Sequence, residues 1–248
     1  MCRAYRERRA CGTRSRIVSG LDRRTPPWFW EVPSFSHRIA EDEFMDDLSR
    51  PEHEFAAAYR ELELINRWLG GVRAIERFLP QIPNLLILDV AAGACDISEA
   101  LCGRISCRIV VLDLNARGLK LANESCPVVG NALQLPFRDQ AFDIVMASLF
   151  FHHLSDEHCV RVLAEMWRTA KRRVLVNDLH RQALAYFSIR ALAAAFSKSE
   201  MVKHDGPVSV RRAFRAAELL EIARRAGVPA RVHRSFPYRL VLVAEKSA

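Results

Sequence analysis

The 248-residue sequence predicts an α/β fold with a doubly wound, mostly parallel sheet of seven strands that ends in an antiparallel pair. Three observations support this prediction. Short apolar runs alternate with segments of helical periodicity through the middle of the chain, as in βαβ units. Small and polar residues follow three of these runs, at the edge where open parallel sheets bind their ligands. The last two strand-like runs, 230–236 and 239–244, are separated by two residues only, too few for a helical crossover.

The predicted elements follow one another from residue 49 onward. Ser49 and Glu52 have the spacing of a helix capping box, and the apolar residues behind them recur at helical spacing. Gly70 and Gly71 interrupt this helix. Strands are then expected at 85–90, 108–113, 128–129, 142–149 and 173–178, with helices at 97–101, 116–123 and 156–170 between them. A last helix at 213–225 precedes the antiparallel pair.

These elements divide the chain into three parts. We expect a basic, disordered extension at 1–40, a helical cap at 41–82 and the main domain at 83–248, with a helical insertion at about 180–210. Residues 1–24 hold eight arginines and two acidic residues, so this stretch carries +6 of the overall charge of +8. The rest of the chain is nearly neutral, which argues against a nucleic-acid partner. The basic stretch can bind phosphates, but a solvated tail is the simpler interpretation.

Cysteine usage and hydropathy indicate a cytoplasmic protein. The seven cysteines are odd in number and form no CxxC pair, which is typical of reduced thiols. The longest apolar stretch, 191–196, is far too short to cross a bilayer, and no hydrophobic signal segment opens the chain. We therefore expect no membrane span, and peripheral membrane contact only if the substrate is a lipid.

Three strand ends carry residues suited to a nucleoside ligand. The turn 89–96 consists largely of small residues, which let a ligand approach the backbone and the N-terminus of the next helix. Asp113 ends the second strand, and its carboxylate can accept hydrogen bonds from both hydroxyls of a ribose. Asn131, after the third strand, can pair with an adenine edge. Each feature also has a structural explanation, such as tight packing or a helix cap, but their order and spacing together favour a nucleoside site.

Four motifs in this region resemble the successive motifs of class I S-adenosylmethionine (SAM)-dependent methyltransferases. They are 88–96 (LDVAAGACD), 111–114 (VLDL), 130–137 (GNALQLPF) and 142–145 (FDIV). Asp96 and the Leu-Pro-Phe run are most similar to the branch that includes ubiquinone- and menaquinone-type methyltransferases. The resemblance covers about residues 84–246 and leaves out the basic extension.

The resemblance implies SAM as the cofactor and assigns residues to it. Asp113 would hold the ribose hydroxyls, and Asn131 with Ala132 would contact the adenine. Two departures from the family are Cys95, which replaces a second glycine and could narrow the loop, and Asn131, which replaces an aspartate but keeps an acceptor oxygen. The remaining members of the expected cofactor set are Asp89, Ala91, Gly93, Ala94, Leu114 and Ser148.

The acceptor side is expected beyond the fourth and fifth strands. His152 stands where the family has its methyl-proximal residues, and we expect it, more than His153, to act as base or positioning group. Asp178 follows the fifth strand and can orient a histidine, and His204 in the insertion is a further candidate for a proton relay. A metal site of His152, Asp178 and His180 is conceivable, but its spacing matches no established ligand pattern, so we expect no metal.

These observations predict SAM-dependent C- or O-methylation of a small, lipophilic acceptor of aromatic or quinone/polyketide-like type. Tyr186, Phe187 and Phe196 in the insertion favour an apolar pocket, although such residues are commonly core. The alternative is a non-catalytic protein that keeps the fold and binds SAM. A nicotinamide-dependent oxidoreductase is disfavoured because it normally needs G-x-G-x-x-G after the first strand, where this chain has one glycine. The sequence indicates neither the identity of the acceptor nor an oligomeric state.

Overall fold

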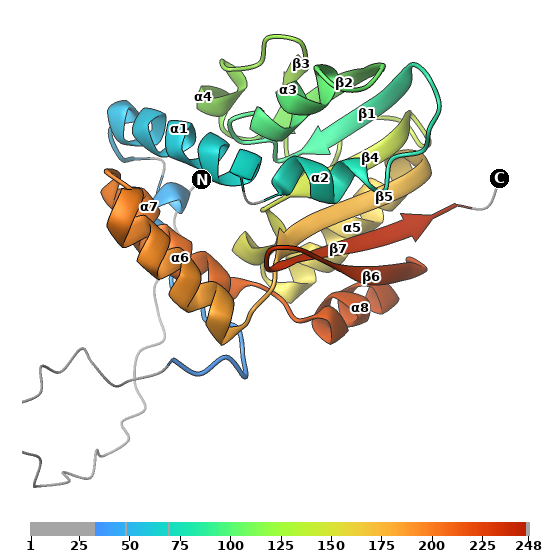
Figure 1. The fold of residues 1–248 in the computed structure, drawn as a ribbon. Coiled ribbons are helices and arrows are strands. Elements are labelled where there is room, and N and C mark those ends of the chain that lie inside the picture. The colour runs from blue at the N-terminus through green and yellow to red at the C-terminus, as the bar shows by residue number, and fades with distance from the viewer. Residues whose placement is uncertain (1–32, 48, 69, 247–248) are drawn as a thin grey trace, which may run out of the picture. The chain divides into compact units, whose positions relative to one another are not determined.

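The computed structural model describes residues 33–47, 49–68 and 70–246 (Figure 1). The Arg-rich residues of the predicted extension lie outside these ranges, and so does the rest of that extension up to residue 32. Among the described residues, no helix has both the length and the apolar character needed to cross a membrane.

A seven-stranded sheet forms the centre of the fold, in the order β3–β2–β1–β4–β5–β7–β6. The strands β1 to β5 pair in parallel, whereas β7 lies antiparallel between β5 and β6. This confirms the predicted doubly wound sheet with a C-terminal antiparallel pair. The strands are β1 (Leu85–Val90), β2 (Cys107–Asp113), β3 (Cys126–Val129), β4 (Phe142–Ser148), β5 (Ala170–Leu179), β6 (Ala230–Ser235) and β7 (Arg239–Glu245).

The apolar runs that predicted the strands are buried because helices cover both faces of the sheet. Successive side chains of a strand point to opposite faces, so each central strand contributes to two cores. One face packs Ile87 and Met146 against α2 (Gly71–Glu76), α3 (Asp96–Cys102) and α4 (Ala116–Leu119). The other face packs Leu88 and Val145 against α5 (Asp156–Thr169) and α8 (Ala216–Arg225).

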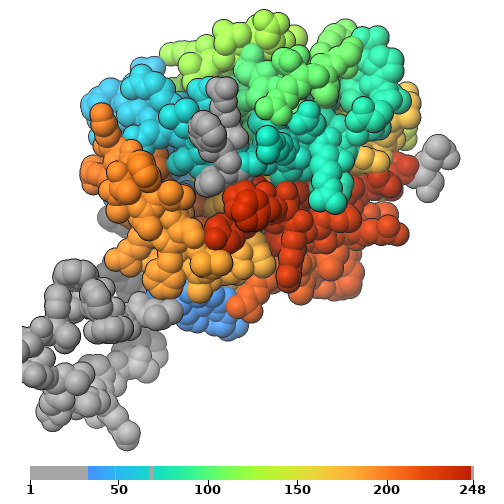
Figure 2. All heavy atoms as spheres, viewed as in Figure 1, coloured from blue at the N-terminus to red at the C-terminus, as the bar shows by residue number. Residues whose placement is uncertain are grey.

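A third group of helices lies beyond the carboxyl ends of the parallel strands. It consists of α1 (Glu52–Trp68), α6 (Ala183–Phe196), α7 (Glu200–Arg212) and the short 3-10 helix η1 (Phe44–Asp46). Figure 1 shows α1, α6 and α7 grouped on the side toward which β1 points, and in Figure 2 the blue atoms of α1 meet the orange atoms of α7. Phe55 of α1 packs in one cluster with Met201 and Val202 of α7. Segments from the predicted cap and the predicted insertion thus form a single cover.

Two helices begin later than the sequence patterns predict. The helix α1 begins at Glu52 and is not capped by Ser49, because the Ser49 hydroxyl donates to the Asp47 carboxylate at 2.6 Å. The helix α8 begins three residues after the predicted start. Phe214, at that predicted start, is instead paired with His180 in an isolated parallel β-bridge. A local side-chain contact thus competes with the first turn of α1, whereas a bridge to a residue distant in sequence delays the start of α8.

Residues 34–40 belong to the predicted extension and lie in the same compact unit as the predicted main domain. The guanidinium of Arg38 lies over the ring of Phe214, 3.9 Å from its centroid. It also donates to the backbone carbonyl of Leu154 at 2.8 Å. These contacts hold the segment on the domain and bring the residues that follow it toward the ends of the strands.

Candidate active site

The turn after β1 begins with a buried carboxylate. Asp89 is 3% exposed, and its Oδ2 accepts a hydrogen bond from the Ser98 hydroxyl at 2.6 Å. Its Oδ1 is buried and has no hydrogen-bond partner among the described residues. Burial raises the pKa of Asp89 to about 7, and the nearby carboxylates of Asp96 and Asp113 add to the shift. A buried acceptor without a partner is costly, so this oxygen is suited to a ligand that donates to it.

The backbone of this turn is left-handed at three positions, with φ of +57° at Ala91, +52° at Gly93 and +62° at Cys95. A Cβ at Gly93 would have no heavy atom within 4 Å, so the turn is open on that side. A Cβ at Gly118 would lie only 1.9 Å from the Gly93 carbonyl oxygen. The glycine in α4 therefore allows this helix to approach the turn closely from behind, while the front stays free for a ligand.

Cys95 stands where the family that the motifs resemble has a glycine. Its side chain points into the core. It is fully buried in a cluster with Ile97, Leu101 and Leu119. Burial raises the pKa of the Cys95 thiol to about 12, so the thiol stays protonated. A left-handed conformation costs a residue with a Cβ about 1–2 kcal/mol, which the buried side chain helps to offset. The thiol does not fill the open side of the turn beside Gly93.

Asp113 connects the end of β2 to the same turn. Its Oδ2 accepts from the Gly93 N–H at 2.9 Å, and its Oδ1 accepts from the Asn115 N–H at 2.7 Å. The N-cap of α4 is Asn115 itself, whose side chain accepts from the Arg117 N–H. Burial and the charge of Asp113 raise the pKa of Tyr59 to about 12, which places this residue of α1 near the carboxylate. Asp113 is thus fixed at the edge and still has acceptor capacity.

The end of β3 lies beside the end of β2, because Asp113 pairs with Val129 in the parallel register. Leu114, directly after Asp113, is 69% exposed. Asn131 is exposed as well, and its Oδ1 accepts from the Leu133 N–H at 2.9 Å. Exposed apolar surface beside fixed polar groups is the usual lining of a small-molecule site.

Two adjacent histidines follow β4 on the 3-10 helix η2 (Phe151–His153). His152 is 3% exposed, and its Nδ1 lies 2.7 Å from Oδ1 of Asp178 at the end of β5. The other oxygen of Asp178 accepts from the His152 backbone N–H at 3.0 Å. Burial alone would raise the pKa of Asp178, but the charge and hydrogen bonds of His152 lower it overall. The carboxylate fixes the ring and leaves Nε2 as the free nitrogen.

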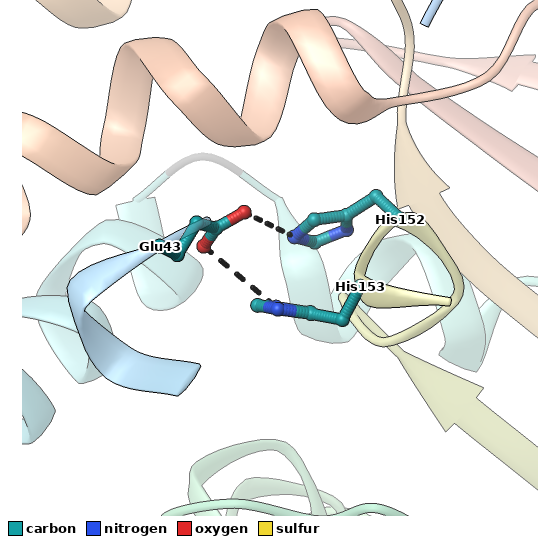
Figure 3. Close-up of side chains that lie close together, drawn as sticks. All are labelled: Glu43, His152 and His153. Atoms are coloured by element: carbon teal, nitrogen blue, oxygen red, sulfur yellow. Dashed lines mark ion pairs between the residues drawn. The ribbon is translucent and has the colours of Figure 1, made fainter. Parts of the chain in front are cut away.

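Glu43, just before η1, faces both histidines (Figure 3). Its Oε1 lies 3.7 Å from Nε2 of His152, and its Oε2 lies 3.8 Å from Nε2 of His153. Glu43 is 4% exposed, and burial raises its pKa to about 7. The segment is held by Asp205 of α7, whose carboxylate accepts the backbone N–H of Phe44 at 2.8 Å. No sequence pattern singles out Glu43, which stands in a segment without a motif.

A cavity of about 170 Å³ separates these residues from the helical cover. Glu43, His152 and His153 all contribute to its wall. The rest of the wall is mostly apolar and includes Leu62, Ile65, Leu149, Ile189, Leu192 and Val202. The cavity therefore offers a small apolar chamber with titratable groups at one side.

Two other histidines from the sequence analysis lie apart from the cavity wall. His204 stacks on Phe44, with ring centroids 3.7 Å apart, and its Nδ1 is 2.8 Å from Asp205. His180 takes part in the bridge to Phe214, and burial lowers its pKa. The structure does not bring His180 together with His152 in a ligand cluster. A relay through His204 would have to pass through Asp205, so its role stays a prediction.

The comparison with protein families adds to this geometry. A family model described as a methyltransferase domain matches residues 87–173, which extend from β1 into β5. Residues 87–173 thus match a methyltransferase domain, which agrees with the resemblance of the four motifs to class I SAM-dependent methyltransferases. The four motifs that carry the resemblance all fall within the matched residues. The observed sheet also agrees with the predicted doubly wound fold.

Demethylmenaquinone methyltransferases are similar to this methyltransferase domain. That of Thermotoga maritima is 32% identical over 106 residues, which are 41% of this chain and 45% of the relative. That of Thermobifida fusca is 35% identical over 95 residues, 35% of this chain and 39% of the relative. That of Renibacterium salmoninarum is 28% identical over 167 residues, 62% of this chain and 68% of the relative. The chain thus spans less than half the length of the first two relatives.

Solved structures share the fold of the methyltransferase domain. A SAM-dependent methyltransferase from Aquifex aeolicus aligns with a TM-score of 0.58 at 16% identity, covering 76% of this chain and 96% of that one. The pyocyanin biosynthetic protein PhzM aligns with a TM-score of 0.56 at 20% identity, covering 83% of this chain and 62% of that one. At these identities the likeness concerns the fold alone.

The residues at the edge of the methyltransferase domain fit SAM. The unpartnered oxygen of Asp89, the open side of Gly93 and the carboxylate of Asp113 suit its amino-acid and ribose parts. An open cavity of about 810 Å³ lies mostly against α1, α3 and α4, and Ala94 is the one predicted cofactor residue among the described residues in its wall. All predicted cofactor residues lie at or directly after the carboxyl ends of β1 to β4: Asp89, Ala91, Gly93, Ala94, Asp113, Leu114, Asn131, Ala132 and Ser148.

Proposed function

We propose that the protein transfers the methyl group of SAM to a small, ring-containing, lipophilic acceptor bound in the cavity at His152. The observation that carries this proposal is a mostly apolar cavity that reaches Leu149, directly after the predicted cofactor residue Ser148, and has a carboxylate-oriented histidine in its wall. Bound SAM supplies an electrophilic methyl group on a sulfonium. The chain itself has to align the acceptor, exclude water and accommodate the proton that leaves.

The cofactor would be held by the ends of β1, β2 and β3. Asp89 and the open turn at Gly93 would receive the methionine part. Asp113 would receive the ribose hydroxyls, because each of its oxygens accepts only one hydrogen bond from the chain and a carboxylate oxygen can accept two. Leu114, Asn131 and Ala132 would surround the adenine. Each assignment agrees with the position of these residues around one edge of the sheet.

The size of the acceptor cavity favours a single ring. An apolar protein cavity of about 150 Å³ holds benzene, so the cavity of about 170 Å³ matches a monocyclic core. The name of the similar demethylmenaquinone methyltransferases points to a quinone-type acceptor for those proteins. We extend this to a quinone- or hydroquinone-like ring here. Methylation of the hydroquinone form replaces the hydroxyl proton when it occurs at oxygen and the ring proton when it occurs at carbon, so a proton is released in either case.

His152 is the residue through which the chain would act on the acceptor. Because Asp178 binds Nδ1, the neutral ring presents Nε2 as an acceptor toward the cavity. This nitrogen can take the proton of an acceptor hydroxyl, or it can hold the acceptor in place. The apolar remainder of the wall excludes water, which strengthens either interaction.

The alternative is a protein that binds SAM without transferring its methyl group. Cys95 favours it, because a second glycine is expected at this position. The burial of the Cys95 side chain argues against it, because the open side of the turn remains free. Calorimetry of the full-length protein with SAM, S-adenosylhomocysteine and a nicotinamide dinucleotide tests the cofactor. Release of S-adenosylhomocysteine with a panel of hydroxylated and quinol rings then separates an enzyme from a binding protein, and binding of neither cofactor form overturns the proposal.

A reducing, cytoplasmic location is part of the proposal. The five cysteines among the described residues are free. Burial raises the pKa of the Cys159 thiol, so it stays protonated and unreactive. Free thiols of this kind are typical of proteins in a reducing compartment. Fractionation of the native host, with this chain detected outside the cytoplasmic fraction, would contradict the assignment.

A further inference from the structure

Glu43, His152 and His153 form a cluster with the composition of a divalent-cation site (Figure 3). One ligand atom from each residue lies within 4.8 Å of the other two. We propose that these residues bind a divalent transition-metal ion, of the class to which Zn²⁺ belongs, in the wall of the acceptor cavity. Imidazole nitrogen and carboxylate oxygen are ligands that zinc and neighbouring transition metals accept. The function of this ion rests on the proposed methyl transfer, but its binding does not.

The distances within the cluster are close to those of a filled site. The two oxygens of Glu43 lie 3.7 Å from Nε2 of His152 and 3.8 Å from Nε2 of His153. Two ligands at about 2.0–2.1 Å from a tetrahedral ion are about 3.3 Å apart. The three ligand atoms lie within 4.8 Å of one another, so the side chains need to close in by up to about 1.5 Å around an ion. The two Glu43–histidine distances are too long for hydrogen bonds. Oε1 of Glu43 is buried without a hydrogen-bond partner among the described residues and needs a positive or donating group.

Each histidine is oriented from behind by a carboxylate. Nδ1 of His152 lies 2.7 Å from Asp178, and Nδ1 of His153 lies 2.8 Å from Asp46. Both Nε2 atoms are therefore directed at Glu43. Metal-binding histidines almost always donate their second ring nitrogen to a carboxylate or carbonyl in this way, which fixes the tautomer and makes the ligand more basic. Packing alone does not require that two carboxylate–histidine pairs both face a third carboxylate.

The charges around the cluster favour a cation. Glu43, Asp46, Asp178 and Asp205 lie in or next to it. Arg212 opposes them, with its Nε 3.8 Å from Oε1 of Glu43 and a hydrogen bond of 2.8 Å to Asp46. Arg239, which also lines the cavity, interacts with the charge of Asp178. The four carboxylates still outnumber the two guanidiniums, and an added divalent ion would compensate the excess negative charge.

The ion would have an open position toward the acceptor. Three protein ligands and one free position are the pattern of catalytic zinc sites. All three ligands line the cavity, so the free position faces the acceptor. A ring bearing a hydroxyl or carbonyl oxygen could coordinate there. The ion would make a coordinated hydroxyl more acidic, so that the hydroxyl could give its proton to solvent as the ring enters the cavity. His152 would then position the acceptor through the ion without taking the proton itself, which narrows the acceptor class to oxygenated rings.

The test is metal binding by the untagged full-length protein after treatment with a chelator. Zn²⁺ is titrated by calorimetry and Co²⁺ by visible absorption, and we expect one ion per chain with the d–d bands of an ordered Co²⁺ site. Asp46→Asn leaves the three ligands in place but removes the carboxylate that orients His153 and pairs with Arg212, and it should weaken Zn²⁺ binding by about 10–100-fold. Glu43→Gln and His153→Ala each remove a ligand and should weaken it further. His158→Ala removes an exposed histidine of α5 and should bind Zn²⁺ like the wild type.

Binding of SAM is measured on every variant, because an unchanged affinity shows that the domain is folded. If Glu43→Gln does not fold, His153→Ala, whose side chain is 21% exposed, still decides the question. Equal Zn²⁺ affinity of the wild type and His153→Ala would overturn the metal site, and so would sub-stoichiometric binding by the wild type. Zn²⁺ binding without SAM binding would instead overturn the proposed function and leave the metal site standing.

Discussion

The cofactor edge and the acceptor cavity of this domain are built in different ways. The cofactor edge is local in sequence, because its residues follow β1, β2 and β3 and nearly all fall between 89 and 132. The acceptor cavity combines the segment at Glu43, α1, η2, α6 and α7, which are distant in sequence. One is held by the backbone of the sheet, and the other by contacts between separate helices. Mutations should therefore separate cofactor binding from handling of the acceptor.

The largest separation is expected for His152→Ala. Loss of a base or positioning group at the reacting centre should lower turnover by about 10²–10⁴-fold. Affinity for SAM should not change, because His152 contacts Asp178 and the cavity wall and none of the residues of the β1 turn. The measurements are kcat and the dissociation constant of SAM, with His158→Ala as control. If kcat falls and the dissociation constant of SAM also rises, His152 is structural and the two regions are not independent.

Asp113→Ala should weaken cofactor binding and leave the binding of the acceptor unchanged. Removal of the carboxylate leaves ribose hydroxyls unpaired and should weaken SAM binding by about 1–3 kcal/mol. The KM of the acceptor should stay the same. Asp139→Ala, which removes an exposed carboxylate that pairs with Arg168, is the matched control. Undiminished binding of SAM by Asp113→Ala would remove this residue from the cofactor edge.

The pH dependence of stability tests the burial of Asp89. Its pKa is about 7 in the folded protein, against about 3.9 for an unfolded aspartate. The folded state therefore keeps a proton that the unfolded state releases, and stability from this group is full below about pH 4 and is lost as the pH rises toward 7. Between about pH 5 and pH 7 the wild type should lose up to about 2 kcal/mol of unfolding free energy through Asp89, and Asp89→Asn should not show this loss. Denaturant unfolding of the cofactor-free protein across this range gives the slope, and parallel curves for both proteins would contradict the assignment.

The smallest effect is expected for Cys95→Gly. The substitution relieves a left-handed backbone but gives up a buried thiol, so the free energy of unfolding should change by less than about 1 kcal/mol. Affinity for SAM should stay as in the wild type, because the thiol lies in the core. Calorimetry on both proteins makes the comparison. A clear gain in affinity would show that the side chain does restrict the cofactor turn.

The two regions also differ in how far the sequence predicts them. Asp89, Asp113 and Asn131 could be identified because each follows an apolar strand run, and parallel strands bring such ends to one edge. The pairing of His152 with Asp178 could be anticipated for the same reason, since β4 and β5 are neighbours. The roles of these residues remain predictions, whereas their placement at one edge is observed.

Glu43 could not be identified in this way. It stands in a short segment without periodicity. Its burial depends on Arg212 and on Asp205, which accepts the backbone N–H of Phe44. His153 received less weight than His152 because its partner, Asp46, comes from the same unpatterned segment. Contacts of this kind arise only when α7 packs over η1, and no local pattern encodes them.

The α6–α7 hairpin leaves and rejoins the domain at a single point. His180 and Phe214 form a parallel bridge there, and the Arg181 N–H donates to the Phe214 carbonyl at 3.0 Å. The Arg181 side chain, completely buried, pairs with Glu218 across the same junction. Because its ends meet, a segment such as 182–213 can be exchanged for another without a change in the path of the sheet. Evolution, or a designer of chimeras, can therefore treat the hairpin as a replaceable module that alters acceptor preference on a constant cofactor-binding core.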